Sequence, residues 1–153
     1  MTGQKKTGYK VSASEKFVSL LNRLPDSPSV KHPQEQPDQH KVVHFIQTYL
    51  SSGMDPTVLP GKVVCSDNVP TDDKEWLAKV KYAQRHKLWH YHIGIPFYVD
   101  DGKGYLTSGY VLHYQQLDET HIKLVDIDWH PPMVLPSEPY LDGDIVIGDT
   151  RSE

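Results

Sequence analysis

The chain of 153 residues has few of the features that mark several large protein classes. Its one cysteine, Cys65, excludes an intramolecular disulfide and the paired cysteines of a zinc ribbon, so we interpret it as structural. No apolar run is long enough to span a bilayer, and the basic N-terminus has no apolar stretch typical of a secretory signal. Phosphate-binding loops and Gly-x-Ser-x-Gly elbows are also missing. We therefore expect a single domain over residues 1–153, without a membrane partner, in the cytoplasm.

Positive charge is scarce at one end of the chain. The formal net charge is −4, yet residues 1–117 hold 14 Lys and Arg against 11 Asp and Glu, a balance of +3. Residues 118–153 hold 2 against 9, a balance of −7. We expect an acidic C-terminal segment over residues 136–153. The overall charge argues against strong non-specific binding to nucleic acid, although the weakly basic body can still meet RNA locally.

The first half of the sequence predicts a short strand and two helices separated by a loop. Residues 8–11 favour the strand, and Ser12 with Glu15 forms a capping-box pattern that predicts a helix as far as Pro25. Residues 25–40 contain four prolines and almost nothing apolar, which indicates an exposed, Pro-rich loop. A second helix is expected after Asp38, ending at Ser52 and Gly53.

The second half predicts three longer strands joined by short connections. They cover residues 87–93, 109–115 and 121–129. Short connections are typical of an antiparallel meander. Weaker patterns indicate a strand at 63–65, a helical turn capped by residues 71–73 and extended structure at 145–147. The sum is an α+β fold with the N-terminal helices on one face of a small antiparallel sheet.

Two histidines, His90 and His92, are the most informative feature of the chain. They lie one residue apart in an alternating segment, so both imidazoles are expected on one face of a strand. The apolar residues of the other face should meet the helices, which leaves the histidines facing outward, where a ligand can reach them. Imidazole titrates near neutrality, so this pair can supply a base and an acid or hold a metal.

Other histidines extend this prediction. His113 lies on the next strand and His130 at the sheet edge that follows the third strand. A single strand histidine is more often a surface or hydrogen-bonded residue than a catalyst, and we favour that interpretation for His113 and His121. A metal site would need His90 and His92 with His86 or His130, and a carboxylate such as Asp100 could join them.

A basic run leads directly into the histidine strand. Basic side chains that alternate with an aromatic ring suit a phosphate backbone, whereas a solvated surface is the equally weighted alternative. The candidate substrate-binding residues in this run are Lys79, Lys81, Arg85 and Lys87.

Three parts of the sequence carry a family resemblance. They are residues 45–53 with Leu59 and Pro60, residues 87–93, and residues 108–114 continuing through 124–127. These segments, in the order strand, helices and three antiparallel strands, resemble the RelE/ParE superfamily of bacterial toxins, most closely its YafO-type branch. The resemblance covers roughly residues 42–135 and implies the RelE-like α+β fold.

The resemblance also implies a function. Members of that superfamily are ribosome-dependent endoribonucleases that cut messenger RNA in the A site and are silenced by an antitoxin protein. The implied partners are mRNA, the ribosome and a cognate antitoxin, with no metal or other cofactor. Cationic residues that handle the RNA fall at His90 and His92, a further functional residue at His130 and a loose candidate at Tyr140. Relatives often carry an arginine where this chain has Val111, which puts the usual phosphate clamp in doubt.

The residues suit metal-independent chemistry. RNA carries its own nucleophile, the 2′-OH, and cleavage needs a base, a cation for the charged phosphorane and an acid for the leaving 5′-oxygen. The hypothesis is that His90 and His92 supply the base and the charge stabilisation, with His130 or His113 as acid. Two alternatives stay open: a non-catalytic relative that only binds a protein, which the acidic balance and Val111 favour, and a metal-dependent enzyme that uses the histidine strand.

Overall fold

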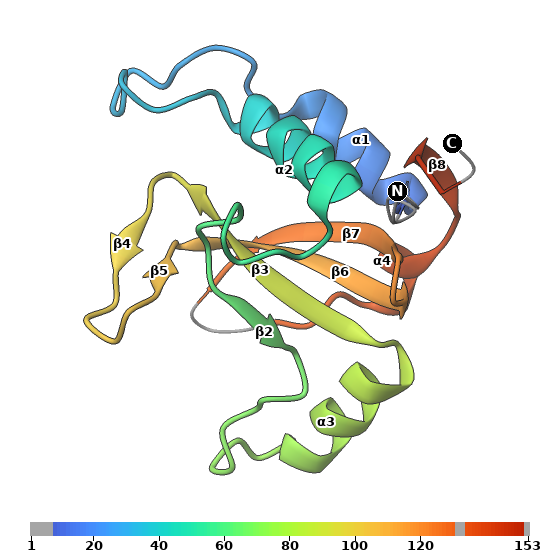
Figure 1. The fold of residues 1–153 in the computed structure, drawn as a ribbon. Coiled ribbons are helices and arrows are strands. Elements are labelled where there is room, and N and C mark those ends of the chain that lie inside the picture. Colours follow the sequence, from blue (N-terminus) through green and yellow to red (C-terminus); the bar gives the residue numbers. More distant parts are fainter. Residues whose placement is uncertain (1–7, 131–133, 152–153) are drawn as a thin grey trace, which may run out of the picture.

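A six-stranded sheet is the centre of the structure, a computed structural model that describes residues 8–130 and 134–151 (Figure 1). The strand order is β2-β3-β6-β7-β1-β8, and β4 and β5 form a separate hairpin. The elements in chain order are β1 (Lys10–Ala13), α1 (Glu15–Arg23), α2 (Asp38–Ser52), β2 (Val63–Cys65), α3 (Trp76–Arg85), β3 (Leu88–Ile95), β4 (Val99–Asp100), β5 (Leu106–Thr107), β6 (Tyr110–Asp118), β7 (His121–Trp129), α4 (Glu138–Leu141) and β8 (Ile145–Asp149).

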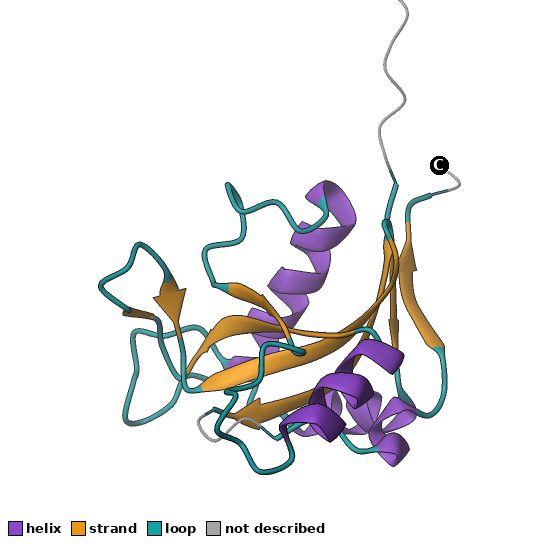
Figure 2. Cartoon of the chain, turned by 90° about the horizontal axis from the view of Figure 1, so that it is seen from below, coloured by secondary structure: helices purple, strands orange, loops and turns teal. Residues whose placement is uncertain are grey.

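The predicted meander is present as β3, β6 and β7, each antiparallel to its neighbour. The α+β class is therefore confirmed, and the predicted short strand at 63–65 is β2 on one edge of the sheet. The sheet is larger than predicted because β1 pairs with β7 in parallel and β8 then pairs with β1. Figure 2 shows β8 as the outermost strand on that side.

The start of the first helix differs from the prediction. Ser14, not Ser12, is the N-cap residue, and its hydroxyl accepts the hydrogen bond from the backbone N–H of Phe17. Ser12 instead lies buried in β1, with its hydroxyl 2.7 Å from Nε2 of His121. The pairing of β1 with both β7 and β8 extends the strand to Ala13, so the helix begins two residues later than the capping pattern indicates.

The second helix and the loop before it follow the sequence pattern. Residues 26–36 are mostly exposed, and α2 begins after Pro37 and ends at Gly53, whose φ of 68° favours glycine. Lys41 ties the end of the loop to the sheet: its ammonium donates to the Glu35 carboxylate and to the backbone carbonyls of Gly94 and Pro96.

The two faces of the sheet are covered differently. Helices α1 and α2 lie on one face (Figure 1). There Phe17, Phe45 and Tyr49 belong to the main apolar core together with Leu112 and Leu124. Helix α3 contacts the other face through a small cluster of Ala83, Leu88 and Val125. The rest of that second face carries the histidines of β3 and β6 together with the buried Val111. None of the helices in the described part of the chain is long and apolar enough to cross a membrane.

Candidate functional site

Four histidines lie together on the face of the sheet away from α1 and α2. His90 and His92 come from β3, His113 from β6, and His130 follows the last residue of β7. The ring centroid of His90 is 5.9 Å from those of His92 and His130 and 6.0 Å from that of His113, and His92 and His130 are also 5.9 Å apart. The structure therefore brings together all four histidines that the sequence analysis singled out as catalytic candidates.

Strand pairing places these rings. His90 lies opposite His113 in the antiparallel register of β3 and β6, and the two-residue period adds His92 to the same face. His130 is held by its backbone N–H, which donates to the carbonyl of Gly109 at 2.6 Å. Gly109 allows the Trp129 ring to lie close to the backbone, and a Cβ atom at this position would require that half-exposed ring to move. The hydrogen bond to Gly109 holds residue 130 beside the start of β6 and so brings His130 to the cluster.

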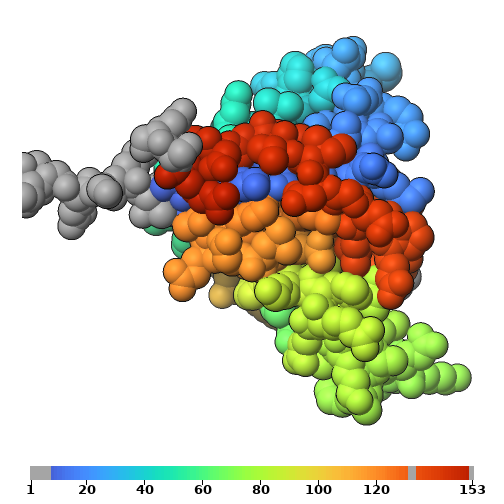
Figure 3. Space-filling model, turned by 90° about the vertical axis from the view of Figure 1, so that its right-hand side faces the viewer, coloured from blue at the N-terminus to red at the C-terminus, as the bar shows by residue number. Residues whose placement is uncertain are grey.

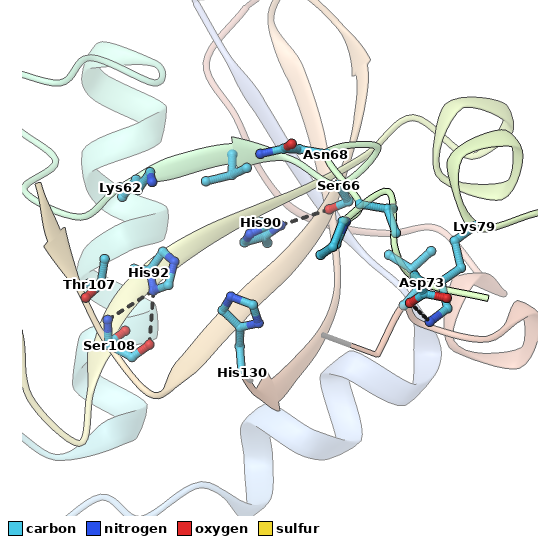
Figure 4. Close-up of a pocket in the computed structure, with 14 residues that line it drawn as sticks. Lys62, Ser66, Asn68, Asp73, Lys79, His90, His92, Thr107, Ser108 and His130 are labelled. Atoms are coloured by element: carbon cyan, nitrogen blue, oxygen red, sulfur yellow. Dashed lines mark hydrogen bonds and ion pairs between the residues drawn. The ribbon is translucent and has the colours of Figure 1, made fainter. Parts of the chain in front are cut away.

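Three of the histidines, His90, His92 and His130, line a cavity of about 600 Å³ (Figure 4). The walls come from the 62–73 segment, from Thr107 and Ser108 before β6, and from Leu135. These walls correct the expectation that the strand histidines face outward into solvent. His90 and His92 are each only 5 % exposed, because segments remote in sequence fold over the sheet and leave the rings reachable only through the cavity.

Hydrogen bonds orient the two strand histidines. Nδ1 of His90 lies 3.0 Å from the hydroxyl of Ser66. Nδ1 of His92 accepts from the backbone N–H of Ser108 and lies equally close, 3.0 Å, to the Ser108 carbonyl (Figure 4). The same backbone residue therefore offers His92 a donor when Nδ1 is unprotonated and an acceptor when it is protonated. In both rings Nδ1 is engaged, so Nε2 is the nitrogen left to meet a substrate.

Burial keeps the cluster neutral. Desolvation lowers the pKa of His90 to about 3, and the neighbouring imidazoles of His113, His92 and His130 add to the effect. Desolvation also lowers the pKa of His113 to about 4 and lowers the pKa values of His92 and His130. Unprotonated imidazole is the form that accepts a proton, so the free protein holds several bases at neutral pH.

His113 differs from the other three. It is 1 % exposed and lies behind His90, and it does not line the cavity. Its Nδ1 is buried without a hydrogen-bond partner in the described part of the chain, a feature that it shares with Nδ1 of His130. His113 is thus placed to pack against His90, while His130 is the candidate acid that reaches the cavity. His121, in contrast, bonds to Ser12 at the start of β7, away from this cavity.

Two carboxylates on the same side of β7 were not predicted as residues of the histidine face. Asp126 pairs with His113 in the strand register and Asp128 with Val111, the neighbour of His92 across the sheet. Desolvation raises the pKa of Asp126 to about 7, with a smaller contribution from Asp128. The sequence signal for them was the two-residue spacing of the carboxylates in the second half of the strand, where they alternate with Val125 and Ile127.

The predicted basic run contributes one residue to the cavity wall, Lys79. Its ammonium is 2.6 Å from the carboxylate of Asp73, so its charge is largely neutralised (Figure 4). The other predicted substrate-binding residues, Lys81, Arg85, Lys87 and Tyr140, do not line the cavity. The first two lie on exposed positions of α3, Lys87 reaches toward the Leu117 carbonyl, and the Tyr140 ring lies 5.4 Å from the ammonium of Lys16.

A different lysine, Lys62, stands at the opposite end of the cavity from Lys79 (Figure 4). Its ammonium lies 5.1 Å from the centre of the Tyr105 ring, a cation–π contact, and it forms no ion pair within 4.0 Å among the described residues, although its charge helps to lower the pKa of Asp101. Sequence alone gave no signal for Lys62, because it precedes a three-residue edge strand rather than the basic run.

The arrangement of the side chains around His90 and His92 does not support the alternative of a metal-dependent enzyme. Residues 8–130 and 134–151 contain no group of three or more His, Cys, Asp or Glu side chains arranged to hold a metal ion. His86 ends α3 against Tyr82, and Asp100 lies in the exposed β4 hairpin, so neither joins His90 and His92.

Comparisons with protein-family models, with curated proteins and with solved structures find no match to this chain.

Proposed function

We propose that this protein is a metal-independent endoribonuclease that cleaves ribosome-bound mRNA, in the manner of the RelE/ParE toxins that the sequence resembles. The observation that carries the proposal is the cavity on which His90, His92 and His130 converge. Imidazole can serve as base and as acid in phosphodiester cleavage, and the nucleophile is the 2′-OH of the RNA itself.

The order of elements adds support. The resemblance rests on a strand, two helices and three antiparallel strands, and β1, α1, α2, β3, β6 and β7 have that order. The 62–85 segment, with β2 and α3, is inserted between the second helix and the meander and supplies part of the cavity wall.

The base in this proposal is His92. Its ring is fixed by Ser108 whether Nδ1 is protonated or not, and burial lowers its pKa so that the neutral, proton-accepting form is present at pH 7. It removes the proton of the 2′-OH, and the resulting oxygen attacks the adjacent phosphorus. His90 lies beside it and presents Nε2 toward the same phosphate.

Charge on the phosphorane needs a cation, and in this protein that cation is Lys62. It takes the place of the arginine that relatives carry at the position of Val111, whose side chain is fully buried here. His130 is the acid that protonates the leaving 5′-oxygen. It is the least buried imidazole of the three in the cavity, and a bound phosphate raises the pKa of a neighbouring histidine and so favours its protonation.

The experiment is cleavage of a labelled mRNA on purified bacterial ribosomes. His90→Ala/His92→Ala is expected to lower the cleavage rate at least about 1,000-fold, because base and phosphate contact are lost together. The matched control is His40→Ala/His44→Ala, which removes two exposed histidines of α2 that do not line this cavity, and it should cleave normally.

Three further results decide the proposal. An mRNA with a 2′-deoxy nucleotide at the scissile position should resist the wild type. Labelled-methionine incorporation after induction in bacteria should stop with the wild type and continue with the double variant. Retention of cleavage by a folded His90→Ala/His92→Ala protein would sink the catalytic assignment.

A second candidate, a non-catalytic protein-binding relative of the same fold, is favoured by one observation. Of the two lysines that line the cavity, Lys79 is neutralised by Asp73, and Val111 is buried where the toxins that the sequence resembles carry an arginine. If folded wild-type protein shows no cleavage and no arrest of translation, this candidate replaces the first.

A further inference from the structure

The aromatic side chain of Tyr105 lies next to the end of the histidine cavity at which Lys62 stands. The Lys62 ammonium, which lines the cavity, is 5.1 Å from the centre of the Tyr105 ring. Thr107, two residues after Tyr105, lines the same end of the cavity (Figure 4). Tyr105 is nevertheless 53 % exposed, so much of this residue is open to a ligand that enters the cavity from this end.

Hydrogen bonds within the β4–β5 hairpin hold the backbone of Tyr105. The carboxylate of Asp101 accepts from the backbone N–H groups of Lys103 at 2.8 Å and Tyr105 at 3.1 Å, and the N–H of Asp101 donates to the Tyr105 carbonyl at 3.0 Å. The N–H of Lys62 donates to the carbonyl of Leu106 at 2.9 Å, which ties the hairpin to the segment that carries the lysine. A ring that is ordered before binding loses little conformational entropy when a ligand stacks on it.

The charges around Tyr105 permit the approach of a polyanion. The carboxylates of Asp100 and Asp101 in the hairpin are matched by the ammonium groups of Lys62 and Lys103, both of which help to lower the pKa of Asp101. The acidic C-terminal segment, red in Figure 3, lies on the side of the molecule that is on the right in Figure 1, whereas the hairpin lies on the left there. A strand of RNA that reaches the cavity past the hairpin therefore does not meet the acidic segment.

We infer that Tyr105 stacks on a nucleobase of single-stranded RNA while the adjoining phosphate meets Lys62 at the end of the cavity. The inference rests on the proposed endoribonuclease function and extends it by naming the residue that holds a nucleotide beside the cleavage site. Unpaired bases stack on exposed aromatic side chains, and they do so with little dependence on sequence because every base has a π-face.

Packing of the protein itself does not account for the position of this ring. Tyr105 belongs to neither of the two apolar clusters that the described residues form. Its contact with Lys62 occupies one side of the ring, and the exposed area lies away from that contact. A base stacked there would cover apolar surface of the ring that now meets water, which favours binding.

The test is binding of fluorescein-labelled, single-stranded hexamers to the full chain, followed by anisotropy in the absence of ribosomes. One hexamer is 2′-O-methyl oligoadenylate, which cannot be cleaved because it lacks a free 2′-OH, and the other is an abasic strand with the same number of phosphates. The oligoadenylate should bind at least about fivefold more tightly than the abasic strand, since the stacking of one base on an aromatic ring supplies that much. Tyr105→Ala should abolish this difference, and Tyr105→Phe should retain it.

Two further variants separate the base from the phosphate. Lys62→Ala should weaken the binding of both hexamers by a similar factor, because its ammonium meets the phosphate and not the base. The matched control is Phe97→Ala, which removes another exposed aromatic ring close to the hairpin; that ring contacts His32 and does not line the cavity. It should leave both affinities unchanged, and circular dichroism establishes that each variant folds.

Three results would each overturn the inference: no binding by the wild type, equal binding of the abasic strand, or unchanged selectivity in a folded Tyr105→Ala protein. Failure of the proposed function gives a different result. Binding that depends on Tyr105, without cleavage of ribosome-bound mRNA, supports the stacking role and removes the nuclease assignment. Cleavage by the wild type without such binding removes the stacking role alone.

Discussion

The two faces of β3 are both buried, but their side chains have different surroundings. On one face Trp89, Tyr91 and Ile93 pack against the apolar core beneath α1 and α2. On the other face His90 and His92 are as deeply buried, yet they meet other imidazoles and a cavity rather than apolar side chains. One strand therefore contributes both to the core and to the candidate site.

The difference is one of free energy. Burial of the apolar face is favourable at roughly 25 cal/mol per Å² of apolar surface. Burial of imidazoles is unfavourable for their protonated form, and a polar atom without a hydrogen bond adds a further penalty. A face that buries three histidines and partly buries a fourth weakens the fold, and such an arrangement is typical of a functional site rather than of a core.

The largest expected effect is on the apolar face. Leu112→Ala is expected to lower the free energy of unfolding by about 2–5 kcal/mol, because Leu112 is fully buried in the main core and its loss leaves a cavity. Urea denaturation at pH 7 measures it. A loss below about 1 kcal/mol would show that this face does not dominate stability.

An intermediate effect is expected on the histidine face when the pH changes. The pKa values of His90 and His113 are lowered to about 3 and about 4, while unfolded histidine titrates near 6.5. Between these values the unfolded chain binds more protons, so stability is retained above about pH 6.5 and falls as the pH drops toward 4. Each histidine contributes a slope of about 1.4 kcal/mol per pH unit in that range.

Asp126 acts in the opposite direction. Its pKa is raised to about 7, so the folded state holds this proton where the unfolded carboxyl has lost it, and the contribution of Asp126 to stability falls as the pH rises from about 4 to 7. Two histidines outweigh one carboxyl. Urea denaturation at pH 5.0 and 6.5 should show a less stable protein at pH 5.0, and Asp126→Asn should steepen the difference. Equal stabilities at both values would contradict the burial of neutral imidazoles.

The alternation of apolar and polar residues correctly predicted which residues form strands and which face of the sheet they occupy. The alternation around His90 and His92 gave the division of β3 into two faces, and β7 spans the predicted residues 121–129. Both inferences depend on neighbours in sequence. The acidic balance of the C-terminal segment also followed from composition, and extended structure at 145–147 is present within β8.

Contacts between distant segments could not be predicted in this way. The cavity exists because the segments that contain Ser66 and Ser108 lie beside β3 and contact His90 and His92. Lys62, just before the edge strand β2, also lines the cavity, and no sequence pattern predicted this position. Tyr140 was predicted to bind substrate because it lies near the C-terminus. In the structure α4 contacts α1, and the Tyr140 ring lies beside Lys16. Such placements are set by strand order and loop path, which one sequence does not reveal.

The smallest expected effect has the opposite sign to that on the apolar face. His113→Leu is expected to leave the free energy of unfolding at pH 7 unchanged or to raise it by about 1 kcal/mol. The reason is that His113 is buried with an unsatisfied Nδ1, and a leucine of similar size removes that penalty.

The same variant should also reduce the slope of the free energy of unfolding against pH by about 1.4 kcal/mol per pH unit below pH 6.5. The reason is that it removes one histidine whose pKa is lowered by folding. Urea denaturation of wild type and His113→Leu at pH 5.0, 6.5 and 7.0 measures both quantities together. Leu112→Ala, next to it in β6 but on the other face, is the matched control: it should lower stability equally at all three values. A loss of more than about 1 kcal/mol in His113→Leu at pH 7 would mean that this imidazole has a stabilising partner, and the contrast between the two faces would then rest on His90 and His92 alone.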